Sequence, residues 1–300
     1  MSCQSASMGL VTAMDNSQYY KFTMTPTTAA TGKQITITNT KDVNNFVYLS
    51  LYSLANLSFN VFIPPNMIAH FDLQNSIITK DASNLVSQIS NIADPSNPLI
   101  YKSGGKTVYI GNRNGYPALS IGSLTGLETS SKITTGTSGA QCYTLYLVVE
   151  RVQNNTNYVG YHNNTTDYGT TGCLQMFVNS TNNYTTNIAN VGQGYGNLTV
   201  SIPAPQSNTR NIFVVSKAPG NTAGETLLYY NNTNIPNTVT AYGRTEIPGT
   251  GFLRLGGFPS AWGQNASGYY ASEVQMFSIN HTVPQITANI SSLMTKWGIV

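Results

Sequence analysis

Short runs of alternating apolar and polar residues, separated by turn-forming residues, extend over most of the chain. The strongest run is Tyr143–Arg151, in which Tyr143, Leu145, Leu147 and Val149 share one face. Its opposite face is also mostly apolar, which is typical of a central strand covered on both sides. Further strands are expected at residues 68–72, 85–89, 98–101, 107–110, 116–121, 174–178, 196–202, 211–217, 225–230, 252–256 and 269–279. This spacing predicts an all-β, two-layer sandwich.

A single helical period occurs in the chain, at its C-terminal end. Ile286, Ile290, Leu293 and Trp297 recur at steps of three and four. Thr282 and Gln285 have the spacing of a capping box, Pro284 suits the first turn, and Gly298 suits the C′ position. We therefore expect a short amphipathic helix that closes onto the sheets.

The N-terminal segment shows a weaker pattern of apolar and polar residues. Residues 1–15 lack periodicity and predict a flexible arm, and weak strands are expected at 19–24, 34–39, 46–52 and 57–63. Pro64 and Pro65 cannot continue a strand ladder, so they mark a boundary. The sequence predicts a small β-rich unit at residues 1–65, used for assembly or anchoring, and a sandwich domain at residues 66–300.

The surface is expected to be polar but poorly charged. Only 8% of the 300 residues are charged and the net charge is +3, whereas 40% are hydrophobic and Tyr alone numbers 19. Disorder is excluded by this apolar content, and nucleic-acid binding is disfavoured because the basic residues are few and scattered. No run is long enough to span a membrane. The composition suits a virion or an extracellular surface.

Targeting and modification signals are mixed. The first residues lack the basic start and apolar core of a signal peptide, so synthesis without one is expected. Glycosylation and chance both explain the N-x-S/T sites, among them Asn56, Asn154, Asn164, Asn179, Asn197, Asn231, Asn265 and Asn289. Cys3, Cys142 and Cys173 are either free thiols or include a Cys142–Cys173 bridge.

Three stretches resemble one family. Ile68-Ala69-His70-Phe71-Asp72 with Asn84-Leu85-Val86-Ser87-Gln88 resembles an opening strand, turn and "VSQW" segment, Asn114-Gly115-Tyr116-Pro117-Ala118-Leu119 resembles "NGKPALRF", and Gly268–Val274 through Lys296-Trp297-Gly298-Ile299 resembles "IAEVIVY … YLAxKWGI". In this order they resemble a concanavalin A-like (laminin-G-like) jelly-roll domain of viral and surface proteins. Ile89 stands where the family usually has Trp, and Asn91 near its Asp. The resemblance implies two antiparallel sheets with a terminal helix.

The acidic residues do not form a hydrolase motif. Glycoside hydrolysis needs two carboxylates about 5–10 Å apart, and the E-x-D-x-E strand of glucanases with this fold is missing. Glu273 matches the family's glutamate, and we expect it to brace the helix, with Lys296 as a candidate partner and Trp297 as a second structural residue. Glu150 and Arg151 are expected at a solvated rim. No cofactor is expected, although Asp167 is a candidate Ca²⁺ ligand.

Glycan binding needs aromatic platforms and amide partners on loops. The segment 153–172 is interpreted as the longest polar loop. The candidates are Tyr158, Tyr161, Asn163, Asn164, Asp167 and Tyr168 there, with Tyr195 and Trp262 elsewhere. The same tyrosines also suit contacts between subunits.

The sequence thus favours a non-enzymatic virion or surface structural protein, of capsid, spike or fibre type, displaying a lectin-like domain. Its expected partners are copies of itself, other virion proteins and cell-surface glycans. A polysaccharide-degrading glycoside hydrolase and a cellular adhesin or S-layer component remain as alternatives.

Overall fold

The computed structural model divides the chain into two compact units, Met1–Pro64 and Pro65–Val300. It describes the strands 6–12, 18–24, 34–35 and 58–59, and then residues 64–103, 107–122, 126–136, 142–151, 156–162, 173–178, 183–189, 196–201, 209–219, 226–235, 249–256 and 268–299. The predicted domains at 1–65 and 66–300 stay a prediction, as does the role of the first in assembly.

The described residues of the first unit form two strand pairs. β1 (Ala6–Thr12) pairs antiparallel with β2 (Gln18–Met24), and β3 (Gln34–Ile35) pairs parallel with β4 (Ser58–Phe59). The prediction of a flexible arm at 1–15 is therefore wrong for β1, whose weak alternation is compensated by a seven-residue register with β2. The predicted strand at 46–52 lies outside the described residues.

One sheet of the second unit has eight strands in its described part. Their order is β20-β19-β18-β13-β22-β10-β9, and β5 pairs with β22 beside β10. The bounds are β5 Met67–Asp72, β9 Val108–Arg113, β10 Tyr116–Ile121, β13 Tyr143–Arg151, β18 Arg210–Lys217, β19 Thr226–Tyr230, β20 Thr233–Ile235 and β22 Tyr269–Phe277. As predicted, β13 is central, between β18 and β22.

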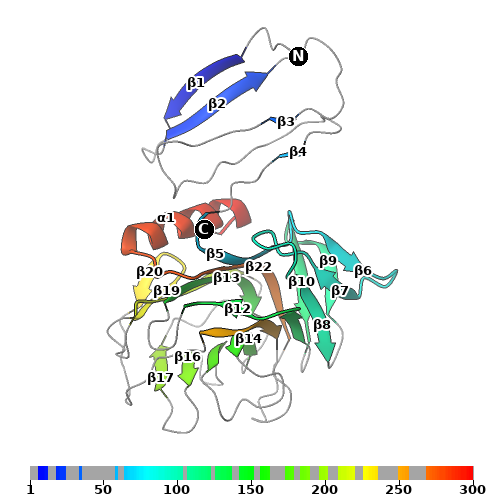
Figure 1. Ribbon diagram of the computed structural model, residues 1–300, viewed down its shortest axis with the longest axis vertical. Helices are drawn as coiled ribbons and strands as arrows, with labels where there is room; N and C mark the ends of the chain where they lie inside the picture. The colour runs from blue at the N-terminus through cyan, green and yellow to red at the C-terminus, as the bar shows by residue number, and fades with distance from the viewer. Residues whose placement is uncertain are drawn as a thin grey trace. The chain divides into compact units, whose positions relative to one another are not determined.

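The other sheet runs in the order β17-β16-β15-β14-β21-β11-β8-β7-β6, with β12 paired to β21. Its bounds are β6 Ile78–Lys80, β7 Val86–Ile89, β8 Leu99–Ser103, β11 Gly126–Thr129, β12 Ile133–Thr134, β14 Thr156–His162, β15 Cys173–Val178, β16 Asn183–Ala189, β17 Gly196–Ser201 and β21 Thr250–Gly256. Figure 1 shows the strands of the two sheets as separate layers, and the predicted all-β sandwich with one C-terminal helix is confirmed.

The two faces of β13 explain its apolar sequence. Leu145 and Leu147 lie on one face of β13, and Tyr146 and Val148 lie on the opposite face. All four side chains are buried. The Tyr146 face is covered by the C-terminal segment, because the Tyr146 hydroxyl lies 2.7 Å from Nδ1 of His281. The other face supplies the core between the sheets, so β13 is buried on both sides.

The helix α1 (Val283–Trp297) forms as the sequence predicts. The backbone N–H of Thr282 donates to Oε1 of Gln285 at 2.9 Å, and Gly298 adopts the left-handed conformation at φ 60°. Its stripe of Ile286, Ile290 and Leu293 is buried, and Figure 1 shows α1 beside β5, β22 and β13. Among the described helical residues, none forms a segment long and apolar enough to cross a membrane.

Two local predictions are wrong. The polar loop expected at 153–172 contains strand β14, which is held on both sides by β15 and β21. The expected solvated position of Glu150 is also wrong, because Glu150 is 1% exposed and its Oε1 lies 2.5 Å from Nη2 of Arg113. In both cases, long-range pairing gives polar residues a place in the sheet that their local sequence does not indicate.

Candidate functional site: a polar network beneath the C-terminal helix

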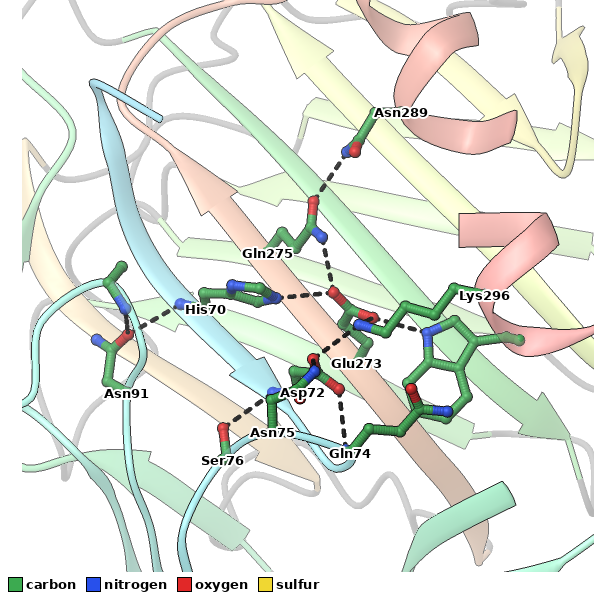
Figure 2. Close-up of polar contacts among 12 residues, drawn as sticks. His70, Asp72, Gln74, Asn75, Ser76, Asn91, Glu273, Gln275, Asn289 and Lys296 are labelled. Atoms are coloured by element: carbon green, nitrogen blue, oxygen red, sulfur yellow. Dashed lines mark hydrogen bonds and ion pairs between the residues drawn. The ribbon is translucent and has the colours of Figure 1, made fainter. Parts of the chain in front are cut away.

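Strands β5 and β22 bring four polar side chains to one face of the first sheet. In their antiparallel register Asp72 lies opposite Glu273, and His70 lies opposite Gln275. His70 and Asp72 are two residues apart on one strand, as are Glu273 and Gln275 on the other, so each pair points to the same face. Figure 2 shows these side chains converging below the end of α1.

Glu273 accepts hydrogen bonds on both carboxylate oxygens. Its Oε1 lies 2.8 Å from Nε2 of His70 and accepts from Nε2 of Gln275 at 2.7 Å. Its Oε2 accepts from Nζ of Lys296 at 2.5 Å and from Nε1 of Trp297 at 2.7 Å. Four donors occupy the roughly four lone-pair directions of a carboxylate, which satisfies the buried charge.

The Lys296 ammonium joins the two acids of the network. It donates to Oδ2 of Asp72 at 2.8 Å as well as to Glu273. Asp72 is buried and also accepts from the backbone N–H of Gln74 at 2.9 Å and from the side-chain amide of Asn75. One buried cation therefore bridges two buried carboxylates (Figure 2).

These contacts set the ionisation of the pair. Burial opposes ionisation of Glu273, but the hydrogen bond from His70 and the charge of Lys296 outweigh it, and its pKa falls to about 2. Burial lowers the pKa of Lys296, but the charges of Glu273 and Asp72 outweigh that effect and raise it. Both side chains are thus held in their charged forms at neutral pH, which is unsuited to a general acid.

The network extends to both sides of Glu273. Oε1 of Gln275 accepts from Nδ2 of Asn289 on α1 at 2.8 Å, and the Oδ1 of Asn91 accepts from the backbone N–H of His70 at 2.9 Å. Because Asn289 is buried and its amide nitrogen is used in this bond, a glycan cannot be attached there in the folded chain. Ile89, which precedes Asn91 in this segment, is fully buried.

His70, Asp72 and Glu273 offer ligand atoms within 4.8 Å of one another. These are ligand types that a metal ion accepts. The Lys296 ammonium, however, lies between the carboxylates of Asp72 and Glu273, where it already supplies a positive charge. A divalent ion would have to displace this ammonium together with the other donors to Glu273, so the residues do not fit a resident metal.

The carboxylate of Glu273 is therefore connected to β5, to Gln275 on its own strand β22 and to the end of α1 through hydrogen bonds and the ion pair with Lys296. The sequence indicates that Glu273, Trp297 and Lys296 interact with one another, but it gives no reason to add His70 or Asp72 to this group. The one available signal is the pair of polar residues at a spacing of two in each of two otherwise apolar strands. The bracing role of Glu273 and Trp297 stays a proposal, which these contacts support.

The predicted glycan-binding residues are only in part within the described structure. Tyr161 is fully buried in β14, and its hydroxyl donates to the carbonyl oxygen of Ile133 at 2.8 Å. Burial raises its pKa. Its choice as a glycan platform is therefore wrong, because it faces the core. Tyr158 lies in β14 by its backbone, whereas the other candidates lie outside the described residues: Asn163, Asn164, Asp167, Tyr168, Tyr195 and Trp262.

Cys142 is a free thiol whose Sγ donates to the carbonyl oxygen of Ser278 at 3.3 Å. The alternative of a Cys142–Cys173 bridge is thus not realised. Cys142 precedes β13 in one sheet, whereas Cys173 begins β15 in the other. The candidate calcium ligand Asp167 lies outside the described residues.

Comparisons with known proteins give structural similarity only. No family model matches the chain, and no curated protein matches its sequence. Among solved structures, the binding domain of Paraclostridial mosquitocidal protein 1 is 10% identical, with a TM-score of 0.47 over 76% of this chain and 52% of that one. The binding domain of botulinum neurotoxin DC in complex with SialylT is 6% identical, with a TM-score of 0.45 over the same shares.

A Trypanosoma rangeli sialidase in complex with 2,3-difluorosialic acid is 9% identical, with a TM-score of 0.49 over 78% of this chain and 34% of that chain. This chain spans about half the length of the toxin binding domains that it matches. Identities and TM-scores this low do not carry a function from those proteins to this chain.

Proposed function

We propose that this chain is a non-enzymatic structural protein of a virion or an extracellular surface, and that it displays a concanavalin A-like sandwich that binds glycans. The observation that carries the proposal is the state of the buried glutamates in the described residues. Glu128, Glu150 and Glu273 each contact a cationic side chain, and they lie on three different strands. Asp72, the carboxylate opposite Glu273, shares the same Lys296 ammonium. Acids that are each neutralised by a cation support binding or architecture over glycoside hydrolysis, which needs a pair free to donate and accept protons.

The polar loops are the proposed contact with neutral sugars. The chain has few charges and many Asn, Thr, Ser and Tyr residues, which donate and accept hydrogen bonds without a strong field. The backbone of β14 ends at His162, opposite Cys173 at the start of β15. Residues 163–172, which hold Asn163, Asn164, Asp167 and Tyr168, connect these two paired strands.

A glycan array tests this function. We expect binding to at least one glycan, and we expect Tyr168→Ala and Trp262→Ala each to reduce it by about tenfold, because stacking on an aromatic ring contributes on the order of 1–2 kcal/mol. Tyr161→Phe is the matched control, since Tyr161 is buried and should leave binding unchanged. An array without any signal would reject glycan binding, and release of reducing sugars from a polysaccharide would favour the hydrolase.

Self-assembly through residues 1–65 is the second half of the proposal. It is supported by the separate compact unit at Met1–Pro64. Electron microscopy of the intact chain should then show a repeating lattice, and strictly monomeric particles at high concentration would reject a shell or spike role.

A further inference from the structure

A second buried glutamate lies in the other sheet, on the face that points away from the core. Leu127 and Leu255 are paired across β11 and β21 and are buried, and the next pair is Glu128 and Arg254. Side chains alternate along a strand, so Glu128 and Arg254 point to the opposite face. Oε2 of Glu128 lies 3.5 Å from Nη1 of Arg254. A Cβ on Gly126 would overlap this guanidinium, so glycine provides its space.

Two lysines and one aromatic ring surround this ion pair. Nζ of Lys102, on β8, lies 3.6 Å from Oε1 of Glu128 and 5.9 Å from the ring centre of Phe252. Nζ of Lys132 lies 5.7 Å from the centre of the same ring. Both lysines are exposed, and 33% of the Lys102 side chain is accessible. We call Lys102, Glu128, Lys132, Phe252 and Arg254 the Phe252 patch.

The Phe252 patch concentrates positive charge in a chain that has little charge. Among the described residues it combines three cationic side chains with one carboxylate, whereas only 8% of the whole sequence is charged and the net charge is +3. Glu128 is buried beside Lys102, and both lysines are exposed. An excess of exposed positive charge around an apolar ring attracts an anionic partner.

The arrangement of the lysines restricts the shape of that partner. Both ammonium groups lie at nearly 6 Å from the centre of one phenyl ring. A single phosphate ion could contact the lysines but would make no use of the apolar ring. A ligand with several acidic groups and an apolar face between them can contact both lysines and the ring together.

We propose that the Phe252 patch binds an acidic oligosaccharide, one that carries sulfate or carboxylate groups on successive sugars. Lys102 and Lys132 pair with two of the acidic groups, and Phe252 packs against the C–H face of the sugar between them. Glu128 holds the Lys102 ammonium at the ring, and Arg254 neutralises Glu128. This site goes beyond the proposed loop site, and it rests on the proposed function only for the saccharide nature of the ligand.

The patch lies beside the last residue of β14. His162 pairs directly with Phe252 on β21. Residues 163–172 follow His162 in the sequence.

Isothermal titration of the full chain with a heparin-derived hexasaccharide at low salt tests the inference, with the neutral maltohexaose as the uncharged probe. We expect binding of the hexasaccharide only, weakened at least about tenfold in the double variant Lys102→Gln, Lys132→Gln and by added salt. Both lysines are exposed, so the variant should fold, and an unchanged circular dichroism spectrum and melting temperature check this.

The matched control is Lys80→Gln. Lys80 is an exposed lysine over an aromatic ring as well, with Nζ 4.5 Å from the ring centre of Tyr109, but it lies at the β6 edge of the sheet. It should change hexasaccharide affinity by less than about twofold. Equal weakening by Lys80→Gln, or none in the double variant, would overturn the inference.

Three further outcomes test the saccharide assignment and separate this inference from the proposed function. Poly-L-glutamate binding as tightly as the hexasaccharide would show a site for any polyanion and overturn the saccharide assignment. Neutral glycans that depend on Tyr168 and Trp262, together with no binding of the hexasaccharide, would overturn the patch and leave the proposed function standing. Loss of every glycan signal would overturn both.

Discussion

The network around Glu273 and the Phe252 patch neutralise a buried glutamate in two different ways. In each, a strand carries a fully or almost fully buried glutamate on the face away from the sandwich core, and a lysine lies beside it. At Glu273 the four partner atoms lie within 2.5–2.8 Å, and Lys296 is 14% exposed. At Glu128 the two cations lie at 3.5 and 3.6 Å, and Lys102 is 33% exposed.

This difference indicates which lysine is occupied by contacts within the fold and which is accessible to a ligand. An ammonium in short contact with two buried carboxylates has little capacity left for a ligand, and its removal leaves charges uncompensated. An ammonium at longer distance, with a third of its side chain in solvent, adds little to stability and remains available. We therefore assign architecture to the first cluster and binding to the second.

The largest expected effect is on stability and comes from the same substitution at the two lysines. Lys296→Met leaves Asp72 and Glu273 buried without their cation, and we expect it to lower the free energy of unfolding by about 3–5 kcal/mol. Lys102→Met leaves Glu128 paired with Arg254 and should cost less than about 1 kcal/mol. Urea unfolding of both variants measures the contrast. Equal losses would remove the distinction between the two clusters.

The dependence of stability on acidic pH tests the contribution of the ionised Glu273. Its pKa is about 2 in the folded chain, against an ordinary value of 4.5, so the unfolded chain binds the proton first as the pH falls. The stability from this ionisation is fully present above about pH 4.5 and is lost as the pH falls through 2. The free-energy difference between wild type and Glu273→Gln should shrink by on the order of 3 kcal/mol from pH 5 to pH 2.

Chemical denaturation of both proteins at closely spaced pH values gives this difference. Subtracting one free energy of unfolding from the other cancels the contributions of other groups that titrate in the same range. Lys102→Met serves as the control, because its free energy of unfolding should differ from that of the wild type by a nearly constant amount over this pH range. A constant gap between wild type and Glu273→Gln would mean that the network does not stabilise the ionised carboxylate.

The sequence was sufficient for the parts of the fold that follow from local periodicity. The apolar alternation of Tyr143–Arg151 and the capping residues of α1 predict their elements correctly. Strand β11 was missed because Gly-Leu-Glu-Thr has a buried glutamate on the second face and a glycine under Arg254, so it shows no apolar alternation. The polar residue of β11 is thus satisfied by distant parts of the chain, which the local sequence does not indicate.

The candidate sites show the same limit more strongly. Glu273 and Lys296 lie 23 residues apart, in the middle of one strand and at the end of the next helix, so the sequence alone can suggest that they pair. Asp72 and His70 are about two hundred residues away, and only the register between β5 and β22 brings them to Glu273. The Phe252 patch similarly combines four separate strands and turns, which no spacing in the sequence indicates.

The smallest expected effect lies at the outer end of the Glu273 network. Asn289→Ala removes the hydrogen bond to Oε1 of Gln275 and leaves that buried oxygen unsatisfied, which costs about 1–2 kcal/mol, offset by a few tenths from the better helix propensity of alanine. Ser291→Ala is the matched control, because it lies at an exposed position of the same helix and destroys the same N-x-S site. Thermal unfolding should show a lower melting temperature for Asn289→Ala only. An equal decrease for Ser291→Ala would indicate that the N-x-S site matters rather than the hydrogen bond, and no decrease in either variant would mean that the network ends at Gln275.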